Sequence, residues 1–473
     1  MGPLLLFFLQ ASAYQSGMQA YGEHRFADAI PFLEKAAAGG SQALAAQYML
    51  GNACLQVHLD EKAVRIFAAL FQVAPDSAAA HLLTAGMMLR AKLETGAAIE
   101  AGRAVEIDPH IPQAHYILGE AALSTGDAGK AVAEFQKEIA ADPSFFMAYY
   151  RLGDAYERRG AWDDAIPVLQ RSIWLNPNHS GPYALIGKAY LKRGDLDDAE
   201  GALRHAQQMD PQDQSIRQLL ELATVHPPTA SPQPAPPSPE IVGRKEYLAG
   251  HIQAAIPWLE KARAAGDRNN ELLFVLGNSY LQTQQVSKGR AAFADLYGVA
   301  AESGAARLVT AHMLMRLEFE DAAQGELEAA LAREPKLPEA HYMLGEIAIY
   351  RAQIDRAVEA LNREIGVNPG FGMAYYRLGD AYTRREDWEH AVPPLQRAVW
   401  LDPTYSGPYI LLGKTYQKQG DLGEAERMLR RALQMDPNNA SAHYLLGRTL
   451  IQAGHEEEGN KLLQRWEEMK KEK

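Results

Sequence analysis

Residues 146–183 read FMAYYRLGDAYERRGAWDDAIPVLQRSIWLNPNHSGPY, and residues 372–409 read GMAYYRLGDAYTRREDWEHAVPPLQRAVWLDPTYSGPY. The second stretch starts 226 residues after the first and repeats most of it. Within the first stretch, Tyr149, Leu152 and Tyr156 recur at the spacing that places side chains on one face of an α-helix. A second helical pattern follows a glycine, so each stretch predicts a pair of helices.

A shorter period of 34 residues underlies the long one. It is kept by small residues and prolines, namely Gly119, Gly153 and Gly187, Ala131, Ala165 and Ala199, and Pro143, Pro177 and Pro211. The same frame predicts six units from about residue 10 to 213 and seven more from about 236 to 473. Because one pair of helices cannot bury its apolar face alone, neighbouring units must complete the core.

Signals for helix ends fall at fixed places in the units. Three dipeptides join a glycine that can end one helix to an aspartate that can cap the next. They are Gly126-Asp127, Gly194-Asp195 and Gly420-Asp421. Some units also carry proline inside the second helix, which we interpret as a structural bend. These prolines are Pro31, Pro167, Pro257, Pro393 and Pro394. No segment alternates convincingly as a strand, so the sequence predicts an all-α fold.

This pattern resembles the tetratricopeptide repeat family, which places a large residue at the fourth position, Leu-Gly at the seventh and eighth, Tyr at the eleventh and Ala at the twentieth. Two units match it closely, through Tyr183, Gly187, Tyr190, Ala199, Leu203, Ala206 and Pro211, and through Tyr409, Gly413, Tyr416, Ala425, Leu429, Ala432 and Pro437. Other units depart from it at Gly289, Gly459, Asp267 and Ala301. The resemblance implies an α-α superhelical solenoid of tandem helix hairpins, here as two arrays in tandem.

A proline-rich stretch, PPTASPQPAPPSP at residues 227–239, separates the two sets of repeats and should favour an extended conformation. We therefore expect a first array over residues 10–224, with about six repeats and an exit helix, and a linker over residues 225–240. The second array is expected over residues 236–473, with about seven repeats of which the last is a C-terminal cap. Duplication of the whole first array with its linker would explain the long offset.

The first thirteen residues do not decide between two cellular compartments. Residues 1–13 contain a short apolar run followed by Ala11-Ser12-Ala13, which resembles a signal-peptidase site but lacks a basic start and a full-length apolar segment. One interpretation is a clipped export signal, which would make the protein periplasmic or secreted. The other is the start of the first helix of a cytoplasmic protein.

Composition narrows the function classes. The net charge of −12 and the pI near 5.7 give no general attraction for nucleic acid, which we therefore do not expect as a partner. The single cysteine, Cys54, excludes an internal disulfide framework and is interpreted as a small core residue. No run approaches the roughly 20 apolar residues of a membrane span. Oligomeric state is not predicted.

No catalytic, metal or cofactor motif is present, so we expect no enzyme activity and no cofactor. His115, His341 and His443 occupy the fourth position of their units, where a packing role is expected. The predicted function is that of a scaffold or adaptor for partner proteins. The alternatives are a regulatory or assembly subunit of a larger enzyme, secretion or glycosyltransferase complex, and a cryptic enzyme.

The resemblance also implies where partners would bind, because the first helices of such repeats line a concave groove. The residues at groove-facing positions that we select as candidates are Tyr150, Asp154, Arg158, Lys188, Lys192, Tyr376, Asp380, Arg384, Lys414 and Lys418. The cations among them suggest protein or peptide partners with acidic segments, and an ordinary solvated charged face is the alternative. Chaperone-binding members clamp a carboxylate with a fifth-position lysine, but Tyr48 and Phe274 stand there, so that activity is not transferred.

Overall fold

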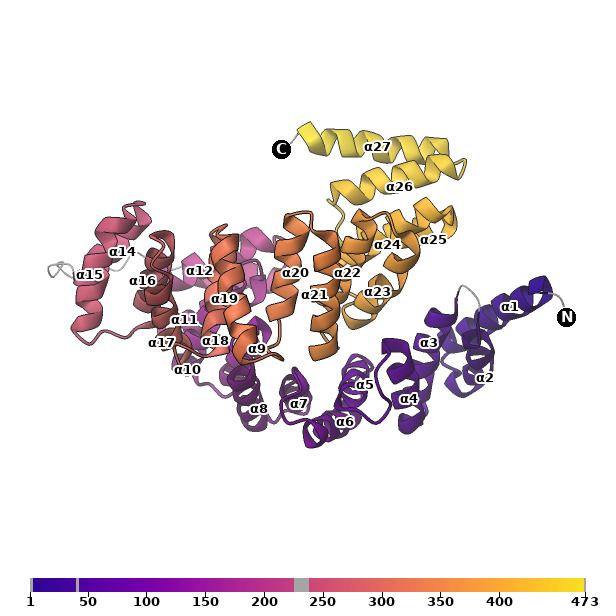
Figure 1. Ribbon diagram of the computed structural model, residues 1–473, viewed down its shortest axis with the longest axis horizontal. Helices are drawn as coiled ribbons and strands as arrows, with labels where there is room; N and C mark the ends of the chain where they lie inside the picture. The colour runs from indigo at the N-terminus through magenta and orange to yellow at the C-terminus, as the bar shows by residue number, and fades with distance from the viewer. Residues whose placement is uncertain (1–2, 40–41, 225–237, 472–473) are drawn as a thin grey trace. The chain divides into compact units, whose positions relative to one another are not determined.

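In this computed structural model, residues 3–39, 42–224 and 238–471 are described, and they form 27 α-helices and no β-strand. Successive helices pack against each other as hairpins (Figure 1). The all-α prediction is therefore confirmed, and the helix pairs follow the period read from the sequence.

The helices form two compact units. The central unit spans Pro112–Ala340, and the terminal unit combines Met1–Ile111 with His341–Lys473. The helices of the central unit are α7 (Ala114–Ser124), α8 (Ala128–Ala141), α9 (Phe146–Arg158), α10 (Trp162–Leu175), α11 (Ser180–Arg193), α12 (Leu196–Met209), α13 (Gln214–Thr224), α14 (Pro239–Leu248), α15 (Ile252–Ala264), α16 (Asn270–Gln282), α17 (Val286–Tyr297), α18 (Gly304–Arg316) and α19 (Glu320–Arg333).

The terminal unit takes helices from both ends of the chain. They are α1 (Pro3–Gly22), α2 (Phe26–Ala37), α3 (Ala43–Gln56), α4 (Asp60–Phe71), α5 (Ala78–Arg90), α6 (Glu94–Ile107), α20 (Ala340–Tyr350), α21 (Ile354–Val367), α22 (Gly372–Arg384), α23 (Trp388–Leu401), α24 (Ser406–Gln419), α25 (Leu422–Met435), α26 (Ala440–Gln452) and α27 (Glu456–Lys471).

Each compact unit thus combines helices from the first half of the chain, residues 3–224, with helices from the second half, residues 238–471. This grouping cuts across the two predicted arrays, whose separation stays a prediction. Residues 225–237, most of the predicted linker, lie outside the described residues. The export signal likewise stays a prediction, since α1 begins at Pro3 and includes that stretch.

Small residues allow the two helices of a pair to approach closely. A Cβ added at Gly153 would lie 2.4 Å from a Leu169 methyl carbon, and one at Gly119 would lie 2.5 Å from the Phe135 ring. Both distances are far below ordinary van der Waals contact. Close contact with the second helix therefore explains glycine at the eighth position.

The Gly-Asp signals act as predicted at two of the three sites. Asp127 Oδ1 accepts a hydrogen bond from Lys130 N at 2.9 Å, and Asp421 Oδ1 accepts one from Glu424 N at 3.1 Å. The prediction was wrong at Asp195, whose side chain makes no capping hydrogen bond. Its carboxylate instead lies 3.0 Å from Nε of Arg193, so an ion pair with the preceding helix replaces the cap.

Candidate partner-binding grooves

The second half of the chain contains a cavity of about 680 Å³ on its first helices. It is lined by α22, α24 and α26, the first helices of three successive pairs, and closed by the last helix, α27. Its walls include Tyr376, Tyr405, Lys414, Tyr444, Leu445 and Trp466. We call this cavity the C-terminal groove.

Helical periodicity explains why these side chains face the groove. On α22, Ala374, Leu378 and Ala381 are buried against neighbouring helices. Because residues three or four apart share a helical face, Tyr376 lies on a different face from this buried stripe. Lys414 occupies the same kind of position on α24, one helix pair further along.

Two pairs of aromatic rings line the C-terminal groove. The ring centroids of Tyr376 and Tyr405 are 5.2 Å apart with the planes at 84°, and those of Tyr444 and Trp466 are 4.8 Å apart at 44°. Burial, with the neighbouring Tyr405 phenol, raises the pKa of Tyr376 well above its usual range. Tyr376 therefore stays neutral at physiological pH and can act as an apolar wall with a polar tip.

One lysine, Lys414, lines the C-terminal groove, and Lys418 lies one helical turn further along α24, outside the lining. Lys414 and Lys418 form no ion pair with any residue in the described part of the chain, and their Nζ atoms lie 5.9 and 6.0 Å from the ring centroid of Trp388. Arg384 is different, because its Nε lies 3.1 Å from Asp380 Oδ1. Among the candidates Arg384, Lys414 and Lys418, the two lysines are therefore the cations that form no ion pair with a described residue.

The equivalent first helices of the first half, α9 and α11, carry the same residue types with different partners. Lys188 forms an ion pair with Glu157. Arg158 Nε lies 3.1 Å from Asp154 Oδ1, and its Nη1 donates to Leu123 O at 3.4 Å. Lys192 is exposed and forms no ion pair with a described residue. We call this face the mid-chain groove.

Tyr150 also lies in the mid-chain groove. Its ring packs on His179, with centroids 5.1 Å apart.

The structure brings together only part of the predicted set. Tyr376 and Lys414 line one cavity, whereas Asp380 and Arg384 form an ion pair with each other. Sequence reasoning missed Tyr405, Tyr444 and Trp466. Tyr444 stands at the fifth position of the last repeat, so the rule that found Tyr376 would have found it. Trp466 had no such signal, because it belongs to the second helix of that pair.

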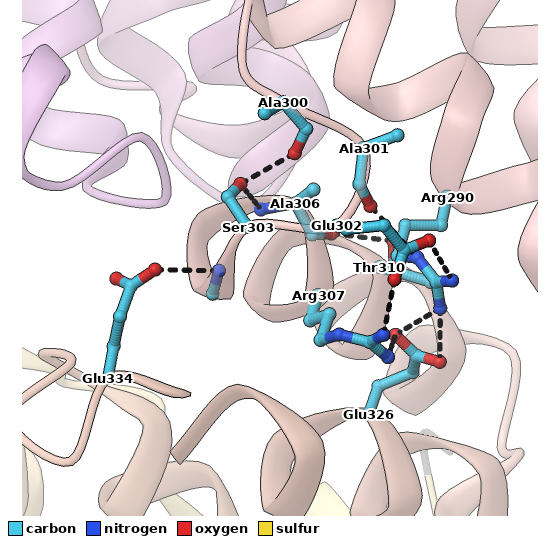
Figure 2. Close-up of polar contacts among 11 residues, drawn as sticks. Arg290, Ala300, Ala301, Glu302, Ser303, Ala306, Arg307, Thr310, Glu326 and Glu334 are labelled. Atoms are coloured by element: carbon cyan, nitrogen blue, oxygen red, sulfur yellow. Dashed lines mark hydrogen bonds and ion pairs between the residues drawn. The ribbon is translucent and has the colours of Figure 1, made fainter. Parts of the chain in front are cut away.

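A second cluster of charged side chains, in the central unit, has a packing role. Arg290 Nη1 donates to both oxygens of Glu326 at 2.7 and 2.9 Å, and its Nη2 donates to Glu302 at 2.8 Å. Arg307 donates to the same two carboxylates at 3.1 and 2.7 Å (Figure 2). The cluster joins α17, α18 and α19, and both carboxylates are occupied within it.

Histidine plays a similar part at the fourth position of other units. His115 Nδ1 lies 2.7 Å from Glu134 Oε2, and His81 Nδ1 lies 2.6 Å from Glu100 Oε2. His443 Nε2 donates to Pro437 O at 2.8 Å. These contacts fit the packing role expected for His115 and His443. Cys54 is fully buried, in agreement with its interpretation as a core residue.

The fold and the groove define a class, that of helical-hairpin repeat proteins. Two family models, both described as tetratricopeptide repeat, match the chain. One matches residues 20–87, 156–223 and 416–472, and the other matches residues 101–144, 118–181 and 342–406. The chain belongs to the tetratricopeptide repeat family. Members of this family are generally protein-binding scaffolds and are typically non-catalytic.

Solved structures similar to the chain are repeat proteins of low identity. YrrB, described as a TPR protein with an unusual peptide-binding site, is 22% identical, covers 36% of this chain and 87% of its own, and has a TM-score of 0.33. Yeast Tom70 is 14% identical, covers 83% and 92%, and has a TM-score of 0.35. The Cut9–Hcn1 hetero-tetramer of the APC/C is 14% identical, covers 93% and 96%, and has a TM-score of 0.33.

No curated protein matches the chain in sequence. Among the residues that the structure describes, no helix is both long and apolar enough to cross a membrane.

Proposed function

We propose that the protein is a non-catalytic scaffold that binds a segment of a partner protein in the C-terminal groove. The observation that carries the proposal is the cavity of about 680 Å³ with aromatic walls and a lysine, Lys414, that forms no ion pair with a described residue, although one acid, Asp436, also lines the cavity. A binding groove needs apolar area that water leaves on binding and a few polar groups that fix orientation. The C-terminal groove has both.

The lining determines the chemistry of the partner segment. Tyr376, Tyr444 and Trp466 offer flat apolar surface at little cost in side-chain entropy, as aromatic residues do at interaction hot spots. Lys414 in the lining, with Lys418 one turn further along α24, favours a carboxylate close to the residue that fills the cavity. The segment we propose therefore carries an acidic side chain next to an aromatic or large aliphatic one.

The charge contribution is modest by itself. An exposed ion pair is worth about 0 to 1 kcal/mol, so the lysines select among segments whose affinity comes mainly from aromatic burial. In the mid-chain groove, Glu157 already neutralises Lys188. The mid-chain groove is therefore proposed as the weaker site for acidic segments.

The test uses the full-length protein on an array of random short peptides, followed by affinity measurement on the best binders. The double variant Lys414→Glu, Lys418→Glu should bind acidic segments more weakly than the wild-type protein does, and added salt should weaken wild-type binding. The matched control is Lys188→Glu, Lys192→Glu, which makes the same change of charge in the mid-chain groove. Wild-type affinity and salt dependence in the first variant would refute the proposal.

A second variant tests the aromatic contribution independently of charge. Trp466→Ala should weaken binding of every selected segment, acidic or not, because it opens one wall of the groove. Trp258→Ala, at a partly exposed tryptophan on α15 outside the groove, is the control. Unchanged affinity for Trp466→Ala would place binding elsewhere on the chain.

A further inference from the structure

The fifth-position aromatics Tyr48 and Phe274 do not face an open groove, because each is covered by the other half of the chain. In the terminal unit, the Tyr48 ring stacks on Trp400 of α23, with centroids 5.0 Å apart and planes at 8°. In the central unit, the Phe274 ring stacks on Trp174 of α10, at 4.5 Å and 7°. Trp174 and Trp400 are themselves 226 residues apart, as are Tyr48 and Phe274.

An arginine from the next helix pair completes each contact. Arg90 Nη1 donates to the carbonyl oxygen of Leu401 at 3.2 Å, and Arg316 Nη1 donates to the carbonyl oxygen of Trp174. Leu401 ends α23, and Trp174 is the penultimate residue of α10. The last carbonyls of a helix lack internal partners and carry partial negative charge, so an arginine there is well placed.

A second aromatic pair lies beside each stack. Phe71, at the end of α4, meets Tyr375 edge to face at 6.0 Å and 77°. Tyr297, at the end of α17, meets Tyr149 at 6.1 Å and 74°. All four rings are at least nine-tenths buried.

Equivalent arginines add polar contacts on the same faces. Arg397 Nε donates to Leu70 O at 2.9 Å in the terminal unit. In the central unit, Arg171 Nη2 donates to Asn270 Oδ1 at 3.5 Å. The ring stacks, the edge-to-face pairs and the Arg90 and Arg316 contacts are therefore made twice, with the roles of the two halves exchanged. Arg397 and Arg171 instead meet partners at non-equivalent positions.

The asparagines that follow these aromatics are also engaged. Asn52 Nδ2 donates to Tyr48 O at 2.8 Å, and Asn278 Nδ2 donates to Phe274 O at 3.0 Å. Each asparagine therefore bonds to the carbonyl oxygen of the aromatic residue one turn earlier in its own helix.

We propose that this duplicated contact is a self-recognition surface. Each half of the chain carries both a receptor part, the aromatic and arginine of its second and third helix pairs, and a ligand part, the tryptophan-bearing end of its fifth pair. A half can therefore hold another half without a covalent link, and the half it holds can come from a second copy of the chain. The inference uses residues outside the C-terminal groove and does not depend on the proposed function.

The experiment places a specific protease site between residues 225 and 237 of the full-length protein and cleaves it after purification. The two fragments should remain together at the mass of the intact chain in size-exclusion chromatography with light scattering. Two nicked preparations of different isotopic mass should exchange halves on mixing, which native mass spectrometry detects. Separation of the wild-type fragments, or failure to exchange, would overturn the proposal.

Variants identify the contact. The double variant Trp174→Ala, Trp400→Ala should release the fragments after cleavage, with a shift to half mass. The control is Trp162→Ala, Trp388→Ala, which removes the tryptophans at the opposite ends of the same two helices. A second double variant, Arg90→Ala with Arg316→Ala, leaves the rings in place. It should weaken the association of the two fragments less than the loss of both tryptophans does. If the fragments of the control variant separated as readily as those of the Trp174→Ala, Trp400→Ala variant, the ring stacks would not be the contact that holds the halves together. Circular dichroism checks that every variant keeps its helix content.

Discussion

The stretches α9–α11 and α22–α24 are nearly the same in sequence and share their packing, yet their grooves differ in charge. Gly153 packs on Leu169 in the first and Gly379 on Leu395 in the second, each with an added Cβ 2.4 Å from the leucine. The interior of the two stretches is therefore equivalent.

One substitution accounts for the difference in charge. Glu157 pairs with Lys188 in the mid-chain groove, whereas the equivalent of Glu157 in the second half is Thr383, whose Oγ1 donates to Gly379 O at 2.7 Å. Lys414, the equivalent of Lys188, is left without an acid. The comparison teaches that packing fixes the helix pairs, while a single groove position decides which lysine is available to a partner.

The largest effect is expected from the shared packing. Gly153→Ala and Gly379→Ala should each destabilise the protein by about 2 to 3 kcal/mol, in the upper range for overpacking, because the added methyl overlaps two atoms of a buried leucine side chain, which must shift. Thermal melting followed by circular dichroism measures the loss. Gly201→Ala and Gly325→Ala, helical sites with nothing within 4 Å of the new methyl, should be neutral or stabilising. If the two variants lost clearly different amounts of thermal stability, the packing of the two stretches would not be equivalent.

A smaller effect is expected just before α9, where the two halves carry Asp142 and Asn368. Asp142 is buried, its Oδ1 accepts from Ser144 N at 2.9 Å, and Ser144 Oγ lies 3.4 Å from Glu339 Oε2. Burial, together with the charge of Glu339, raises the pKa of Asp142 well above its usual range. The folded state thus holds this proton more tightly than the unfolded state, and stability falls as the pH rises through the folded pKa.

Asp142→Asn should therefore stabilise the protein at about pH 8, by about 1 to 2 kcal/mol, the scale of an unfavourably buried polar group. The gain should vanish towards about pH 3, below the ordinary aspartate pKa of about 3.9, where the carboxyl is mostly neutral in both states. Asparagine keeps the local turn, since Asn176 Oδ1 accepts from Asn178 N at 3.1 Å in the next pair. Melting curves at both pH values check this, and a gain that does not depend on pH would contradict the assignment.

The smallest effect tests the groove charge directly. Thr383→Glu should weaken binding of an acidic segment to the C-terminal groove by about fivefold, or roughly 1 kcal/mol, by giving Lys414 the partner that Lys188 has. Glu157→Thr should strengthen binding to the mid-chain groove by a similar factor. Fluorescence polarisation with a labelled segment measures both.

Gln434→Glu is the control for the charge exchange, because it adds the same charge on α25, a second helix. Equal changes in this control would mean that net charge, and not the groove position, is responsible.

The local signals in the sequence were enough to place the helix pairs. The 34-residue spacing of glycine, alanine and proline located the pairs, and the structure explains that spacing by the close helix contact at Gly119 and Gly153. The prediction failed at Asp195, where an ion pair with Arg193 competes with the cap. Groove candidates were found by position alone, which identified Tyr376 and Lys414 but not Trp466.

The sequence by itself thus determined the family, the helix pairs and the residues that fill the interior of each pair, because these depend on neighbours at most one repeat away. Only the tertiary structure decided which groove positions are open. Tyr48 and Tyr376 hold the same position in their repeats, yet Tyr48 is covered by Trp400 and Tyr376 lines a cavity. No local pattern separates them, because the residue that covers Tyr48 comes from the other half of the chain.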